Sequence, residues 1–196
     1  MSACINYLIE ANLSMEDKTL QRALQILSNE NDKEKFQPNI NRVKNADLLK
    51  VYKKNNIRKI KHLELIDKLR IDRNQAIIIG SSVLVLCNIV NSNDDLDLVV
   101  TKPAFNKAAK SVDVIKTYKR EYNKVFYQTP HQELELAVNF QILGTTTEKL
   151  LSRAVNIEGY NFMSLRDTYR MYNILNRAKD IDKLAKLKKI FSVGHL

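Results

Sequence analysis

The chain of 196 residues is poor in the residue types that disulfide frameworks, zinc sites and turn-rich folds require. It contains two cysteines, four glycines and three prolines. Cys4 and Cys87 are too few for a disulfide framework or a zinc site, and Cys87 lies in an apolar run that is typical of a core. So few turn residues argue against a solenoid or a β-sandwich. The sequence instead favours helices with a few strands, in one compact domain or one domain with a small helical addition.

Long apolar runs are also missing. No apolar run approaches the roughly 20 residues that a membrane-spanning helix needs. The first residues, Met1 to Tyr7, lack the charged region followed by a long apolar one that a secretory signal has. From these two absences we expect a cytoplasmic protein without a membrane partner.

The chain has fewer acidic than basic residues. It contains 32 lysines and arginines and 22 aspartates and glutamates, which gives a formal net charge of +10. Residues 1–74 carry 15 basic and 10 acidic side chains, and residues 141–196 carry 10 and 5. Residues 75–140 carry 7 of each sign and are neutral. Basic flanks suit a polyanion such as a nucleotide or RNA. Solvated helix faces explain the same residues equally well.

Helical spacing of apolar residues dominates the first third of the chain. A capped helix is predicted from Ser14, a second helix over 46–54 and a third over 58–70, where apolar residues recur every three positions. No chemical motif accompanies these helices. We therefore expect residues 1–61 to form a helical extension and residues 62–196 to form the main domain.

The pattern changes at residue 75 to short runs rich in β-branched residues. Residues 75–80 predict a buried strand ending at glycine, and the Gly-Ser-Ser that follows favours a short helix over 81–90. Residues 95–100 then predict a strand with acids on one face and leucines on the other. Further strands are predicted over 124–128 and 133–140, and further helices over 145–154, 164–175 and 180–191. The expected fold class is α+β, with a small mixed sheet flanked by helices.

Asp95 and Asp97 are separated by one residue on a predicted strand, so both side chains leave the same face. Two ionised carboxylates so close repel each other, and a divalent cation removes that penalty. Carboxylate oxygens suit Mg²⁺ or Mn²⁺, and nucleotidyl transfer uses such a site to hold a triphosphate and activate the attacking oxygen. Gly80, at the end of the neighbouring strand, lets a phosphate approach the backbone closely.

This order of elements resembles the nucleotidyltransferase superfamily of the polymerase-β type. The family signature is a strand ending in Gly-Gly or Gly-Ser, a short helix, and a strand carrying Asp-hydrophobic-Asp or Glu. Gly-Ser-Ser at 80–82 and Asp-Leu-Asp at 95–97 match it, over a resemblance that covers roughly 66–191. The commoner Gly-Gly-Ser is absent, and the spacer of 13 residues before the aspartates is long. The resemblance implies metal binding by Asp95 and Asp97, and nucleotide-phosphate contacts from Gly80, Ser81 and Ser82.

The resemblance also implies a third carboxylate on a later strand beside the aspartates. Glu135 is the candidate, and Glu133 on the same face of the predicted strand is the alternative. Glu135 would complete the metal site and help to deprotonate an acceptor. Polar residues that alternate along an edge strand would produce the same pattern.

The C-terminal segment carries a second part of the resemblance. Small members of the superfamily, similar to abortive-infection toxins, often end with a helix, an Arg-x-Lys-Asp junction and a final helix. Arg177-Ala-Lys179-Asp180 matches that junction, and it implies that Arg177 or Lys179 reaches the triphosphate. In the alternative, Asp180 caps the last helix and the basic residues are solvated. Arg170 and Tyr172 stand where that group often has a lysine.

These features imply Mg²⁺-dependent transfer of a nucleoside monophosphate from a nucleoside triphosphate, such as ATP, to an acceptor hydroxyl. The acceptor stays open between RNA or tRNA, a protein and a small molecule. One alternative is a catalytically inactive protein of the same fold that binds nucleic acid or a partner. Another is a helical partner-binding protein in which Asp-Leu-Asp is accidental, and absence of a strand at 95–100 would favour it.

Overall fold

The computed structural model describes residues 45–111, 113–119 and 124–193, and the helix predicted from Ser14 lies outside them. All of the described residues belong to one compact unit. Residues 45–61, which the sequence assigned to a helical extension, therefore lie in the same unit as the sheet.

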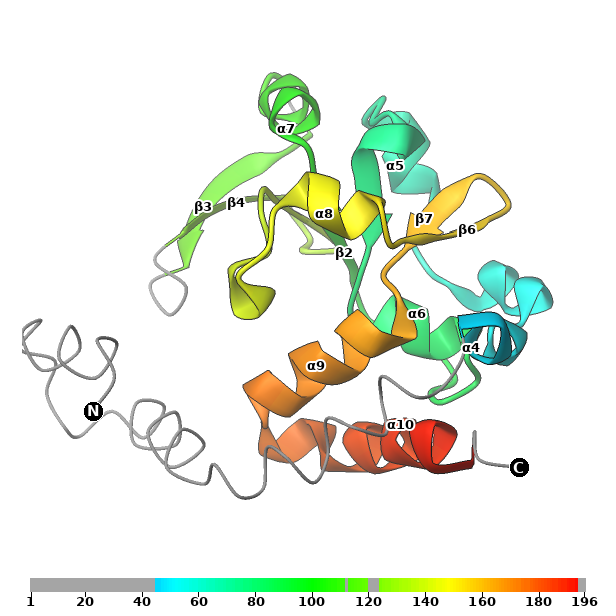
Figure 1. Cartoon of the computed structure of the whole chain (residues 1–196). Helices are drawn as coiled ribbons and strands as arrows, with labels where there is room; N and C mark the ends of the chain where they lie inside the picture. The colour runs from blue at the N-terminus through cyan, green and yellow to red at the C-terminus, as the bar shows by residue number, and fades with distance from the viewer. Residues whose placement is uncertain (1–44, 112, 120–123, 194–196) are drawn as a thin grey trace, which may run out of the picture. The chain divides into compact units, whose positions relative to one another are not determined.

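Seven strands form one mixed sheet in the order β3-β4-β5-β2-β1-β7-β6 (Figure 1). β5 is parallel to β2 and β7 is parallel to β1, whereas the other neighbouring strands are antiparallel. Helices surround this sheet, so the predicted α+β class is confirmed. The strands are β1 (Ala76–Ile78), β2 (Leu96–Val100), β3 (Ile115–Lys119), β4 (Lys124–Gln128), β5 (Leu134–Ala137), β6 (Val155–Ile157) and β7 (Tyr160–Phe162).

The centre of the sheet is where the sequence pattern and the observed burial agree best. All three residues of β1 are buried, as its β-branched run predicts. In β2 the side chains of Leu96 and Leu98 are fully buried, while Asp97 between them is only partly buried. Alternation along a strand sends these side chains to opposite faces, so the leucines join the core and the acid faces outward. The strand at 95–100 also disfavours an accidental Asp-Leu-Asp in a helical protein.

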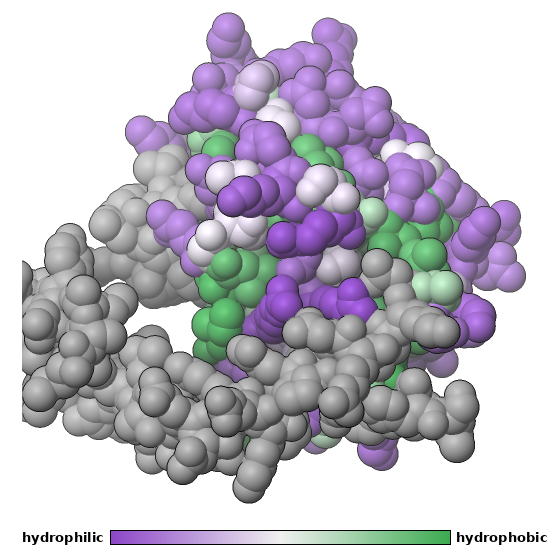
Figure 2. Space-filling model, in the orientation of Figure 1, coloured by the Kyte–Doolittle hydropathy of each residue, from purple (hydrophilic) through white to green (hydrophobic). Residues whose placement is uncertain are grey.

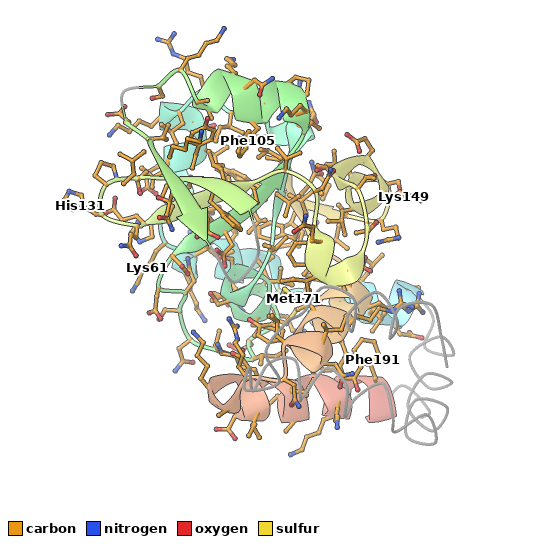
Figure 3. The ribbon with its side chains drawn as sticks, turned by 90° about the vertical axis from the view of Figure 1, so that its left-hand side faces the viewer. Lys61, Phe105, His131, Lys149, Met171 and Phe191 are labelled. Carbon is orange, nitrogen blue, oxygen red and sulfur yellow. The ribbon has the colours of Figure 1, made fainter. Side chains whose placement is uncertain are left out.

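The helices are short except for the last two. Ser164 caps α9, because its hydroxyl accepts a hydrogen bond from the Asp167 backbone N–H at 3.2 Å. α9 then packs against α10, and the ring centroids of Tyr169 and Phe191 lie 5.3 Å apart in an edge-on arrangement (Phe191 is labelled in Figure 3). The α-helices are α4 (Asn45–Val51), α5 (Glu64–Lys68), α6 (Ser81–Leu86), α7 (Lys102–Ala108), α8 (Thr147–Leu151), α9 (Leu165–Leu175) and α10 (Ile181–Val193).

One predicted helix is wrong. The sequence predicts a single helix over 58–70, but the chain forms a 3-10 helix, η1 (Lys54–Lys59), a turn, and then α5. The side chain of Asn93 accepts a hydrogen bond from the Lys61 N–H at 2.8 Å and donates one to the Lys61 carbonyl at 3.2 Å. A continuous helix needs both groups, and His62 follows in the left-handed region at φ 69°.

The surface in the view of Figure 2 is mostly hydrophilic, with small hydrophobic areas between. The buried apolar side chains come from the central strands and from α6, where Val83, Leu84, Val85 and Leu86 are all fully buried. No helix in the described part of the chain is both long and apolar enough to cross a membrane.

Candidate functional site

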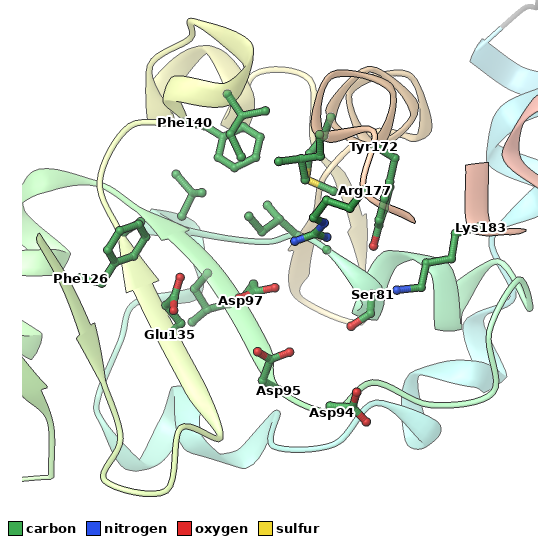
Figure 4. Close-up of a pocket in the computed structure, with 18 of the residues that line it drawn as sticks. Ser81, Asp94, Asp95, Asp97, Phe126, Glu135, Phe140, Tyr172, Arg177 and Lys183 are labelled. Carbon is green, nitrogen blue, oxygen red and sulfur yellow. The ribbon is translucent and has the colours of Figure 1, made fainter. Parts of the chain in front are cut away.

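Asp97 stands at the centre of the sheet, between two strands that fix its backbone. It is in register with Glu135, its partner on the parallel strand β5. On the other side its carbonyl accepts a hydrogen bond from the Ile79 N–H, just beyond the end of β1, at 3.0 Å. Asp95 directly precedes β2, and Figure 4 shows the carboxylates of all three acids on the sheet side of one cavity.

Gly80 is required by the close approach of Asp97. Its φ is +70° and its ψ is −141°, a combination that side chains strongly disfavour. A Cβ atom at this position would lie 2.6 Å from the Oδ2 atom of Asp97. Glycine therefore lets the turn between β1 and α6 pass directly against the carboxylate of Asp97, which a residue with a side chain could not do.

Glu135 is oriented by the next strand along the sheet. The Nε2 atom of Gln128, a buried residue of β4, donates a hydrogen bond to the Oε2 atom of Glu135 at 2.8 Å. Gln128 and Glu135 are also paired in register. Glu135 lines the cavity, and Glu133 is not among the lining residues. Geometry therefore favours Glu135 over Glu133 as the third carboxylate of this cavity.

The cavity has a volume of about 490 Å³ and is lined by charges of both signs. We call the acidic side chains on the sheet side the acidic wall: Asp94, Asp95, Asp97 and Glu135. We call the cationic side chains from the C-terminal helices the basic wall: Arg177, Lys179 and Lys183. Apolar side chains, including Phe126, Phe140 and Met171, line the remaining surface. The volume falls in the range of ordinary small-molecule sites.

Asp180 holds two cations of the basic wall, Arg177 and Lys183, through its buried side chain. Its side chain is 1% exposed, accepts a hydrogen bond from Arg177 Nε, and accepts one from Lys183 Nζ at 3.0 Å. Burial alone raises the pKa of Asp180, but the hydrogen bonds from the two cations outweigh it and hold the pKa below its ordinary value. Lys179 is exposed at the same junction. In the sequence-based alternative Asp180 caps a helix and both Arg177 and Lys179 are solvated. That alternative is incomplete for Arg177, which Asp180 holds, while Lys179 is exposed as it expects.

Tyr172 lines the same cavity beside the basic wall (Figure 4). Its ring is buried, and the ammonium of Lys183 lies 5.7 Å from the ring centroid. Burial raises the pKa of the Tyr172 hydroxyl, and the negative charges of Asp180, Asp97 and Asp95 raise it further, while Arg177 lowers it. The hydroxyl is therefore held in its neutral form.

Most of the residues that the sequence singles out meet at this cavity. Ser82 does not: its side chain is fully buried in α6 and its hydroxyl has no hydrogen-bond partner among the described residues. Sequence reasoning missed Lys183, although its spacing of three from Asp180 on a helix is a recognisable signal. The predicted residues that line the cavity are Gly80, Ser81, Asp95, Asp97, Glu135, Arg177 and Lys179.

The acidic wall has the donor chemistry of a Mg²⁺ or Mn²⁺ site, since its ligands are carboxylate oxygens. Within the described residues, however, no three histidine, cysteine, aspartate or glutamate side chains converge closely enough to hold a metal ion together. Metal binding by Asp95, Asp97 and Glu135 thus stays a prediction, carried by donor chemistry and by the register of Asp97 with Glu135.

No protein-family model, curated protein or solved structure matches this chain. The resemblance to nucleotidyltransferases therefore stays a prediction that rests on the sequence motifs.

Proposed function

We propose that this chain is a Mg²⁺-dependent nucleotidyltransferase that moves a nucleoside monophosphate from a nucleoside triphosphate to an acceptor hydroxyl. The observation that carries the proposal is the cavity, in which the acidic wall faces the basic wall. A nucleoside triphosphate has an anionic tail that suits the cations, and the carboxylates would hold the Mg²⁺ that neutralises the charge of its phosphates.

In the proposed reaction the acceptor oxygen forms a bond to the α-phosphorus, and the bond from that phosphorus to the bridging oxygen breaks. Pyrophosphate leaves, and the proton of the acceptor hydroxyl passes to a carboxylate, for which Glu135 is the candidate. Asp95 and Asp97 would hold Mg²⁺, which supplies charge neutralisation of the phosphates and a lowered pKa of the attacking hydroxyl.

Other side chains of the cavity would bind the phosphates and orient the carboxylates. Arg177 and Lys183, held by Asp180, are positioned to bind the leaving pyrophosphate, with Lys179 beside them. Gly80 keeps the turn before α6 against Asp97, so that a phosphate bound beside the two would meet both the backbone of the turn and the metal ligand. Gln128 fixes the direction in which Glu135 presents its carboxylate.

The test is transfer of label from each α-labelled nucleoside triphosphate to total RNA or to cell extract in the presence of Mg²⁺. We expect Asp97→Asn and Glu135→Gln to reduce transfer by about 100-fold or more, since each removes a charge needed in the transition state. The matched control is Glu133→Gln, two residues away and outside the cavity, which should transfer at the wild-type rate. Unchanged transfer by Asp97→Asn would refute the proposal.

A second candidate is an inactive protein that binds a nucleotide without transferring it. It is favoured by the absence, among the described residues, of three converging metal ligands. The enzyme and the inactive binding protein can be distinguished by measuring both the binding of a fluorescent nucleoside triphosphate and the transfer of label. Binding that Arg177→Gln weakens, with no transfer to any acceptor, would establish the second.

A further inference from the structure

A run of cations lies on η1 and the turn that follows it, outside the cavity. The basic segment, residues 53–61, contains five lysines or arginines and no acidic residue. All five side chains are exposed, and none of them forms an ion pair with a described residue. They are Lys53, Lys54, Arg58, Lys59 and Lys61.

The apolar members of the basic segment point inward. Ile57 and Ile60 are 5% and 6% exposed, and the buried Asn56 side chain donates to the Val85 carbonyl of α6 at 3.2 Å. The Lys53 N–H donates to the Leu86 carbonyl at 2.9 Å. The segment is thus fixed on α6 and offers solvent only cationic and polar groups. A surface that inserts into a membrane needs exposed apolar side chains, so this one suits a hydrophilic polyanion instead.

The basic segment is tied directly to the acidic wall through Asn93. This side chain is 1% exposed, and it joins both backbone groups of Lys61 to the carbonyl of Asp95, to which its Nδ2 donates at 2.9 Å. A buried amide with three partners holds its surroundings in one arrangement. The end of the basic segment is therefore fixed next to Asp95 of the acidic wall.

We propose that the basic segment binds an RNA strand, and that the strand's terminal hydroxyl enters the cavity beside Asp95 as the acceptor. This inference rests on the proposed function and names its acceptor class. Lysines and arginines bind phosphates with release of counterions. The carboxylates of the acidic wall repel phosphates where no Mg²⁺ neutralises them, and they accept an uncharged terminal ribose. The end of the RNA strand, rather than its middle, thus fits the edge of the cavity. Proteins most often recognise RNA at single-stranded ends and loops.

The test uses the full chain and the fluorescence anisotropy of a short labelled single-stranded RNA, without nucleotide or Mg²⁺. The variant is Lys54→Gln/Arg58→Gln/Lys59→Gln. The control, Lys107→Gln/Lys110→Gln/Lys149→Gln, removes the same charge from exposed residues elsewhere; Figure 3 shows Lys61 and Lys149 on opposite sides of the molecule. Because all six side chains are exposed, both variants should unfold at the wild-type urea midpoint.

We expect the basic-segment variant to bind RNA roughly 10–100-fold more weakly and to lower the salt slope by about 2, while the control changes affinity by less than about 3-fold. Equal losses in both variants would overturn the proposal, because net charge alone would then explain binding. It would also be overturned by tighter binding to DNA of the same sequence, or by binding to phosphatidylserine vesicles and not to RNA.

The outcomes for this surface and for the proposed enzyme are separable. RNA binding through the basic segment with no label transfer would keep the surface and refute the enzyme. Transfer to RNA with the same KM for RNA in the wild type and the basic-segment variant would keep the enzyme and refute the surface. If both proposals hold, the variant raises the KM for RNA and leaves binding of the nucleoside triphosphate unchanged.

Discussion

The acidic wall and the basic wall are built by different means. On the sheet side, Asp97 and Glu135 are held by main-chain hydrogen bonds of neighbouring strands, on both sides of Asp97. On the helical side, Arg177 and Lys183 are held through their side chains, by one buried carboxylate. The junction they share begins at Asn176, whose φ of 40° ends α9 in the left-handed region.

This difference decides how each wall responds to substitution. Main-chain ladders do not depend on which side chain a strand carries, so replacing a carboxylate of the acidic wall leaves its neighbours in place. The basic wall depends on Asp180, and its loss releases two cations together. A change in the acidic wall should therefore affect chemistry more than stability, while a change at Asp180 should affect both.

The largest combined effect on label transfer and stability is expected at Gly80, where the backbone itself meets the acidic wall. Gly80→Ala places a Cβ 2.6 Å from Asp97 Oδ2 and forces a side chain onto a φ of +70°. Either the turn or the carboxylate must move, and a shift of about 1 Å reduces transfer on the order of 100-fold. The free energy of unfolding should fall by about 1–3 kcal/mol. Label transfer and urea unfolding measure the two effects.

Gly144→Ala is the matched control for this substitution. Gly144 also has a positive φ, +57°, but a Cβ there would meet no atom within 4 Å. It should lose stability through backbone strain alone and transfer label at the wild-type rate. If the two alanine variants behave alike, the contact between Gly80 and Asp97 has no functional role.

A smaller effect is expected from the anchor of the basic wall. Asp180→Asn keeps the shape of the side chain and removes its charge, so Arg177 and Lys183 lose a charge-assisted partner. Both cations are partly exposed, which limits the loss of stability at neutral pH to about 1–2 kcal/mol. Affinity for a nucleoside triphosphate should also fall several-fold. Asp182→Asn, an exposed acid in the same helix, is the control and should change neither.

The lowered pKa of Asp180 also predicts how its contribution to the free energy of unfolding changes with pH. The pKa of Asp180 is lowered in the folded chain from an ordinary value of 3.8, so its contribution to stability is present above that pH. The contribution is lost as the pH falls through the lowered pKa. The difference in unfolding free energy between wild type and Asp180→Asn should therefore shrink below about pH 4. A constant difference across that range would contradict the anchoring role.

The acidic wall could be predicted from the sequence because strand alternation is local. The spacing of Asp95 and Asp97 determines their common face, and burial of Leu96 and Leu98 determines the other. The glycine before α6 could be predicted as a close approach, although not as a contact with Asp97 itself. Glu135 could not be separated from Glu133 because the two lie on the same face of the strand predicted over 133–140. The hydrogen bond from Gln128 to Glu135 is visible only in the folded chain.

The helical parts were harder to predict because tertiary contacts override local spacing. The apolar residues of 58–70 recur at helical intervals, and Ile60 and Ile66 are indeed buried. The chain nevertheless turns at Lys61, where the distant side chain of Asn93 takes the backbone groups that a helix would use. The edge strand β3 was also hard to predict, for another reason: its sequence shows no clear alternation of apolar and polar residues, and its Ile115 is 48% exposed.

The smallest effect is expected at Tyr172, which lines the cavity beside the basic wall. Burial and the nearby carboxylates raise the pKa of its hydroxyl, so the group stays protonated at every pH at which catalysis is measured. It forms no hydrogen bond with a described residue, so Tyr172→Phe should change the free energy of unfolding by less than about 1 kcal/mol. The pH profile of label transfer should keep its shape. Tyr169→Phe, on the same helix but outside the cavity, is the control. If Tyr172→Phe alone reduces transfer strongly, this hydroxyl contacts the substrate, and the two walls act through a shared group rather than independently.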